Sequence, residues 1–98
     1  MATTYEKYLE CNIIQDVLFK EQAANIEYLN ALEMKLNALN LNSNTTDTAR
    51  NTVVTKIDEV KSKISEFAED IETVNTARRT ILGEMVTTDL QISLNYQF

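Results

Sequence analysis

The sequence predicts an all-α fold: a long antiparallel helical hairpin, similar to a coiled coil, with a C-terminal β-strand tail, completed by other subunits. Three observations indicate this fold. A heptad repeat of apolar residues runs through the second half, a polar segment interrupts the helical pattern, and the last nine residues alternate between apolar and polar. The chain has no proline and one glycine, Gly83, so few residues oppose long helices.

The length of 98 residues is enough for one small domain, which we expect to be a single helical hairpin over residues 1–98. A domain of this size has a core that is barely sufficient, so contacts with other subunits are expected to contribute to its stability. The predicted parts are a helix over 3–39, a turn over 40–46, a helix over 47–86 and a strand-like tail over 90–98.

The second helix carries the clearest signal, a row of a and d positions whose spacing alternates between four and three residues without a slip. Arg78 is the one charged residue in this row. Such spacing places the row on one face, which we predict to be a helix-seam interface packed against other helices. The seam residues are Val53, Ile57, Val60, Ile64, Phe67, Ile71, Val74, Arg78, Ile81 and Met85.

The first helix has a weaker heptad row, with three polar positions in its first half and four leucines at its end. Ile13, Ile14, Val17 and Phe19 lie off the row, so this half is apolar on more than one side. That excess indicates contact with more than the other arm of the hairpin. The row consists of Tyr8, Cys11, Gln15, Leu18, Gln22, Asn25, Leu29, Leu32, Leu36 and Leu39.

The predicted helix starts have recognisable caps. Thr3 and Glu6 have the spacing of a capping box, in which the threonine hydroxyl accepts a hydrogen bond from the backbone of Glu6. Asn44, Thr45 and Thr46 can each cap the second helix, because their side chains favour turns and N-cap positions.

The C-terminal segment alternates apolar and polar residues at every step, which is the period of a strand with one apolar face. No other segment has this pattern, so we expect the strand to pair with the sheet of a neighbouring subunit. The alternative is a helix, in which Leu90, Leu94 and Phe98 share one face. The strand-pairing residues are Leu90, Ile92, Leu94, Tyr96 and Phe98.

The charge balance argues against two classes of partner. A net charge of −6, with nine basic residues, gives little basis for binding nucleic-acid phosphates or anionic lipid. No apolar run is long enough to span a bilayer, and Met1 is not followed by the pattern of a cleavable signal peptide. We therefore expect protein partners, no nucleic acid and no membrane, and a cytoplasmic or virion location.

The residue types argue against catalysis. Histidine is absent, which excludes the usual zinc sites and histidine-activated nucleophiles, and the single cysteine, Cys11, can form no disulfide within the chain. An acidic cluster at Glu66, Glu69, Asp70 and Glu72 lacks the loop and glycine of a calcium site. We expect no catalytic, cofactor-binding or metal site, no cofactor, and no enzyme activity.

These observations together favour a non-enzymatic structural or assembly subunit of a larger complex, with a virus or phage particle as the leading setting. It would join its neighbours, copies of itself or other assembly proteins, through the heptad seam and the C-terminal strand. One alternative is a secretion-system filament subunit or its chaperone, whose C-terminus would pack as helix. Another is a small acidic inhibitor that binds a basic site on an enzyme.

Overall fold

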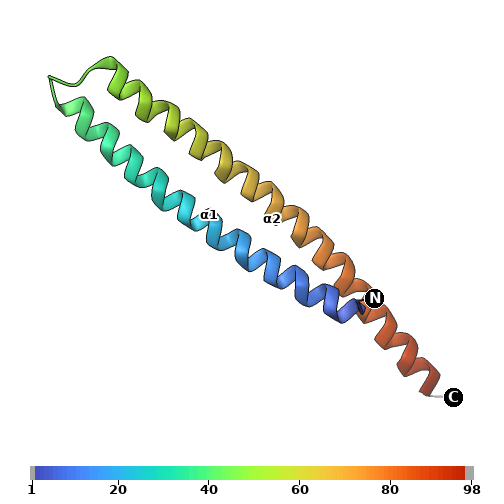
Figure 1. Cartoon of the computed structure of the whole chain (residues 1–98). Coiled ribbons are helices and arrows are strands. Elements are labelled where there is room, and N and C mark those ends of the chain that lie inside the picture. The colour runs from blue at the N-terminus through green and yellow to red at the C-terminus, as the bar shows by residue number, and fades with distance from the viewer. Residues whose placement is uncertain (1, 97–98) are drawn as a thin grey trace. The chain divides into compact units, whose positions relative to one another are not determined.

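The computed structural model describes the backbone of residues 2–96 and the side chains of residues 2–87. It contains two helices, α1 (Thr4–Leu41, 38 residues) and α2 (Asp47–Tyr96, 50 residues), joined by a short turn (Figure 1). The predicted all-helical hairpin is confirmed. α2 begins at the predicted residue but continues ten residues beyond the predicted end.

The contacts within the chain divide it into two units. One comprises residues 19–69, which include the turn, and is called here the turn unit. The other comprises residues 1–18 and 70–98, and is called the terminal unit. Each unit therefore contains a part of α1 and a part of α2.

The turn is held by side chains that bond to nearby backbone. The side-chain oxygen of Asn42 accepts a hydrogen bond from the backbone N–H of Asn44 at 2.9 Å. The Thr46 hydroxyl accepts one from the N–H of Ala49 at 3.2 Å, so Thr46 is the cap of α2 among the three candidates. The second bond satisfies one of the backbone N–H groups that the start of a helix leaves unpaired.

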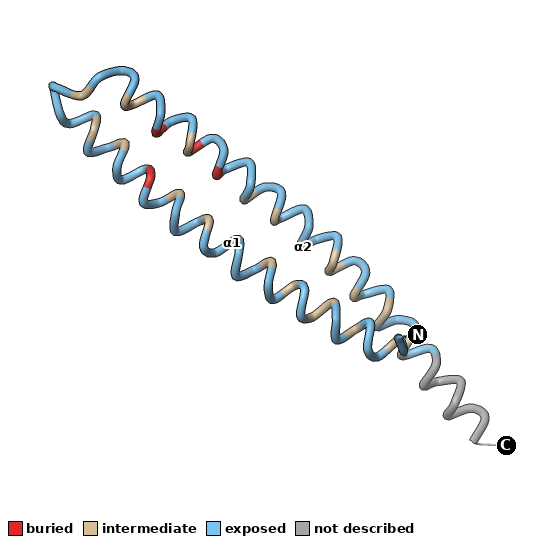
Figure 2. The backbone as a smooth tube through the Cα atoms, viewed as in Figure 1, coloured by how far each residue is buried: buried red, intermediate tan, exposed pale blue. Residues whose placement is uncertain are grey.

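The core of the turn unit lies close to the turn (Figure 2). Its most buried member is Val60, whose surface is 1% exposed. Burying an aliphatic side chain of this kind stabilises a fold by roughly 1.5–3 kcal/mol. The buried residues are Leu32 from α1 and Val53, Ile57 and Val60 from α2, with Leu29, Leu36, Leu39 and Ile64 packed against them.

The terminal unit begins with the predicted N-cap. The Thr3 hydroxyl accepts a hydrogen bond from the backbone N–H of Glu6 at 3.1 Å, and the Thr3 carbonyl accepts one from Lys7 at 3.0 Å. None of the residues whose side chains are described in this unit is buried; the residues along its two heptad rows are half-buried.

The predicted strand over 90–98 is not found, because α2 continues through Tyr96 and residues 90–96 are helical. Residues 97–98 lie outside the described part of the chain. A lone strand leaves its backbone N–H and C=O groups unpaired, whereas a helix satisfies them internally. Among residues 2–96 there is no second strand to pair with, so local hydrogen bonding prevails over the period-two pattern.

Candidate interaction surfaces

The heptad row of α2 lies on one face that is covered throughout its described length, but unevenly. In the turn unit its first three members are buried and the next two, Ile64 and Phe67, are half-buried. In the terminal unit all five members are half-buried: Ile71, Val74, Arg78, Ile81 and Met85.

The heptad row of α1 is also half-buried or buried at every position, including its polar residues. The Gln22 side-chain amide donates a hydrogen bond to the Ile64 carbonyl of α2 at 3.5 Å, and the Asn25 amide donates to the Glu21 carbonyl at 2.9 Å. Gln22 thus joins the two helices of the turn unit. Sequence reasoning missed this role, although a glutamine at a core heptad position was the available signal.

Arg78 is the exception within the α2 row. Its Nη2 donates to the side-chain oxygen of Asn75, one turn earlier, at 3.2 Å. Its Nε is buried and has no hydrogen-bond partner among the described residues. A buried polar group without a partner costs about 1–3 kcal/mol of folding free energy, so the Arg78 Nε makes the terminal unit less stable.

Apolar side chains are exposed on both helices. The four residues that lie off the α1 row, Ile13, Ile14, Val17 and Phe19, are all exposed, as their heptad positions suggested. Leu82 and Val86, four residues apart on α2, are exposed as well. Neither helix of the described chain therefore confines its apolar residues to the face turned toward the other.

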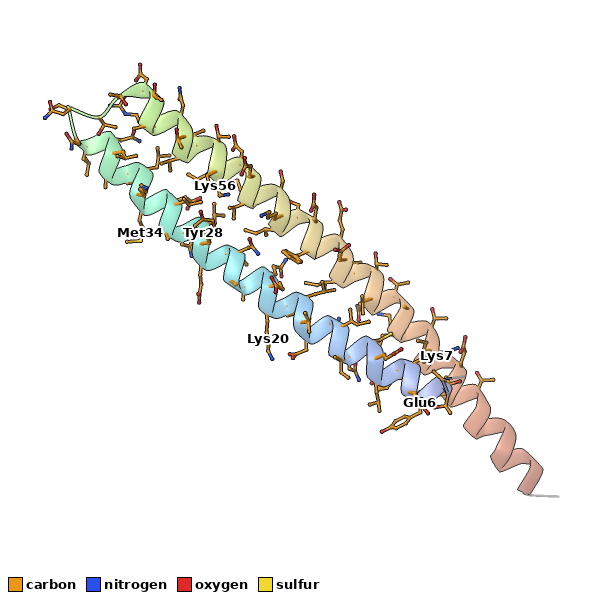
Figure 3. The ribbon with its side chains drawn as sticks, in the orientation of Figure 1. Glu6, Lys7, Lys20, Tyr28, Met34 and Lys56 are labelled. Carbon is orange, nitrogen blue, oxygen red and sulfur yellow. The ribbon has the colours of Figure 1, made fainter. Side chains whose placement is uncertain are left out.

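A groove of about 740 Å³ runs along one side of the turn unit. Tyr28 and Lys35 line it from α1, and Lys56 and Glu59 line it from α2; Figure 3 labels Tyr28 and Lys56. Lys56 forms an ion pair with Glu59 at 3.4 Å. The lining contains neither cysteine nor histidine, so it lacks an activated nucleophile of the common kinds. The remaining lining residues are Leu32, Thr48, Asn51, Thr52, Val53 and Thr55.

The cysteine and the acidic side chains of the described residues do not form a metal site. Within the described residues no group of three or more cysteine, histidine, aspartate or glutamate side chains is placed to hold a metal ion. Cys11 is a free thiol, half-buried in the α1 row, where a small side chain fits a helix contact. No helix in the described part of the chain has an apolar stretch long enough to cross a bilayer.

Comparison with known proteins adds no relative from which a role could be transferred. The sequence matches no protein-family model, and no curated protein or solved structure is significantly similar to it. The functional proposal therefore rests on the surfaces described above.

Proposed function

We propose that this protein is a non-enzymatic structural subunit of a larger assembly, built from copies of itself, from other proteins, or from both. The observation that carries the proposal is the excess of exposed apolar surface. Among residues 2–87, thirteen large apolar side chains are between 39% and 89% exposed, whereas four are buried. Contiguous exposed apolar surface on small proteins marks sites of contact with other molecules.

The energetics of a two-helix hairpin support the same proposal. Two helices bury only the strip between them, and a domain of this size is close to the lower limit for a self-sufficient core. The four buried residues each contribute roughly 1.5–3 kcal/mol, which is small beside the conformational entropy of ordering a chain of this length. Contacts with neighbouring subunits would supply the missing burial.

A virus or phage particle is the setting we propose, with a cytoplasmic or virion location, because such particles contain many small helical subunits. This step is by analogy. The heptad seam and the C-terminal segment would join neighbours. Strand pairing by residues 90–98 would require the helical segment 90–96 to unwind when a neighbouring sheet edge becomes available.

A secretion-system filament subunit, or the chaperone of one, is the second candidate. It is favoured by one observation, the continuation of α2 as helix through Tyr96. α2 is 12 residues longer than α1 (50 against 38), so α1 cannot cover all of it. In this candidate a neighbouring subunit would cover the end of α2 as a helix.

The assembly proposal is tested by the native mass of the purified protein. Sedimentation equilibrium or native mass spectrometry at micromolar to submillimolar concentration should detect dimers or larger species. A chain that stays monomeric throughout this range, and remains fully helical, would contradict self-assembly. Assembly with a different protein would then be tested by its co-purification with a second structural protein.

The role of the C-terminal segment is tested by deleting residues 90–98. The truncated hairpin should stay helical by circular dichroism and fail to join its assembly. Ile92→Glu separates the candidates, and Leu94→Glu is its control, because Leu94→Glu should block assembly through either a strand or a helix. Ile92→Glu should block strand pairing but leave a helical contact through Leu90 and Leu94 intact, since Ile92 lies on the opposite side of that helix.

A further inference from the structure

We infer that two copies of this chain pack against each other along α1, in antiparallel orientation, with Ala23 of each copy at the two-fold axis. The inference rests on the proposed assembly role and identifies one contact within it. The segment concerned is 19–27 of the turn unit. Five of its residues share one exposed face that is self-complementary in shape and charge: Phe19, Lys20, Ala23, Ile26 and Glu27.

The face is defined by helical spacing and exposure. Phe19, Ala23 and Ile26 follow one another at four and three residues, so they lie along one side of α1. All three are exposed, Phe19 by 50% and Ile26 by 43%. The neighbouring row through Gln22 and Asn25 is half-buried, and Gln22 bonds to α2, so this face lies beside the hairpin contact and is open to another chain.

Charged residues form the other edge of this face. Lys20 and Glu27 stand seven residues apart, next to the line through Ala23, and both are exposed. The Lys20 side chain points away from α2 (Figure 3). Lys20 also has an interaction within its own chain. Its side chain is long and flexible, so it can in addition form an ion pair with a carboxylate of another copy.

A two-fold axis through Ala23, perpendicular to the helix, makes the two copies complementary. It brings Phe19 of one copy opposite Ile26 of the other, and Lys20 opposite Glu27, and each contact occurs twice. A parallel two-fold arrangement would instead turn the edge with Lys20 and Glu27 toward the opposite edge of the other copy, so these two residues would not meet. Complementary charges fix the orientation of a contact, so the charge pattern selects the antiparallel arrangement.

Ala23 allows the two helices to approach closely at the axis. Helices pack at about 8–10 Å between axes, with the shorter distances where small residues meet.

The contact involves one helix face per copy, so we expect it to bury less than the ~800 Å² that each partner buries in a typical stable complex. We therefore expect a weak dimer when this contact acts alone. Repetition of several weak contacts would give a stable assembly, because linked contacts reinforce one another.

A cysteine placed at the axis tests the geometry directly. In a Cys11→Ser background, Ala23→Cys should form a disulfide-linked dimer under mild oxidation, since the two Cα atoms at the axis would lie within the roughly 4.4–6.8 Å that a disulfide spans. Ala31→Cys is the matched control: it is also an exposed alanine of α1, but it lies eight residues from the axis, so its two copies would be about 24 Å apart along the helices. It should stay unlinked under the same conditions.

Charge reversal provides a second, independent measurement. Lys20→Glu and Glu27→Lys should each weaken dimerisation of the full chain by about tenfold or more in sedimentation equilibrium, because each creates like-charge contacts twice. The double variant should recover the wild-type affinity within about twofold.

The possible results separate this inference from the proposed function. An oligomeric protein in which Ala23→Cys links no better than Ala31→Cys, or in which the double reversal restores nothing, would overturn the α1 contact while leaving the assembly role intact. A protein that is monomeric at every concentration and forms no complex would overturn both.

Discussion

The turn unit and the terminal unit are built from the same two helices and the same heptad spacing, yet among residues 2–87 only the turn unit has buried residues. The α2 row is comparably apolar in both, apart from Arg78. The α1 row differs: it has leucine at four successive positions, 29 to 39, in the turn unit, but Tyr8, Cys11 and Gln15 in the terminal unit. An apolar row on one helix thus becomes buried only where the facing row of the other helix also has apolar side chains that fill the space between them.

The two units also differ in what a neighbouring subunit could supply to each of them. The turn unit has a small closed core with apolar residues left over on its outside, such as Phe19 and Ile26. The terminal unit has no closed core among its described residues and contains the unpartnered Nε of Arg78. We therefore expect the turn unit to hold the hairpin together in the free chain, and the terminal unit to depend more on neighbours.

The largest effect is expected from removing a core side chain in the turn unit. Ile57→Ala deletes a buried side chain and should cost about 2–5 kcal/mol of unfolding free energy, enough to unfold much of an isolated hairpin. The same change at the half-buried Ile81 of the terminal unit should cost clearly less, because less surface is removed from a looser contact. Chemical denaturation followed by circular dichroism measures both, and equal losses would show that the two units are equally well packed.

A smaller effect of opposite sign is expected at the seam of the terminal unit. Arg78→Leu removes the buried Nε and continues the apolar row, while arginine and leucine have similar helix propensities. The unfolding free energy should therefore rise by about 1 kcal/mol, a part of the cost of a buried unpaired group. Arg79→Leu, at the neighbouring exposed position, is the control and should leave the melting temperature within error. A loss of stability at Arg78 would mean that the guanidinium has a stabilising partner.

The smallest effect is expected at Gly83, which lies within α2 of the terminal unit. A Cβ built there meets nothing within 4 Å, so alanine fits without a clash. Gly83→Ala should raise stability by about 0.5–1 kcal/mol through helix propensity and a less flexible unfolded chain. Slower amide exchange confined to the surrounding turns of α2 would support this, whereas lower helicity would indicate that a bend at Gly83 is needed.

The two helices and the turn between them could be predicted from local sequence patterns. The spacing of Val53, Ile57 and Val60 predicted the covered face of α2, and the polar residues around Asn42 predicted the turn. The cap at Thr3 was predictable because a hydroxyl just before a helix can accept a hydrogen bond from the first turn of that helix. For α2 the sequence offered three candidates, Asn44, Thr45 and Thr46, and the structure distinguishes Thr46.

The C-terminal segment could not be predicted by the same means. Alternation from Leu90 onward describes a strand only if a second strand exists to pair with it, and periodicity contains no information about the partner. Likewise, Gln22 and Tyr8 both occupy core positions of the α1 heptad row, and the sequence does not distinguish them. The folded structure shows that Gln22 bonds to α2 and that both side chains are half-buried.

Amide hydrogen exchange of the full-length chain, measured at several protein concentrations, tests most directly whether neighbouring subunits complete this fold. Residues 53–60 should be strongly protected at every concentration, because their core is closed within the hairpin. Protection of residues 4–18 and 70–87 should be low in dilute protein and rise as the concentration passes the point of assembly. Uniform protection of both units that does not change with concentration would contradict the account, since the hairpin would then be complete by itself.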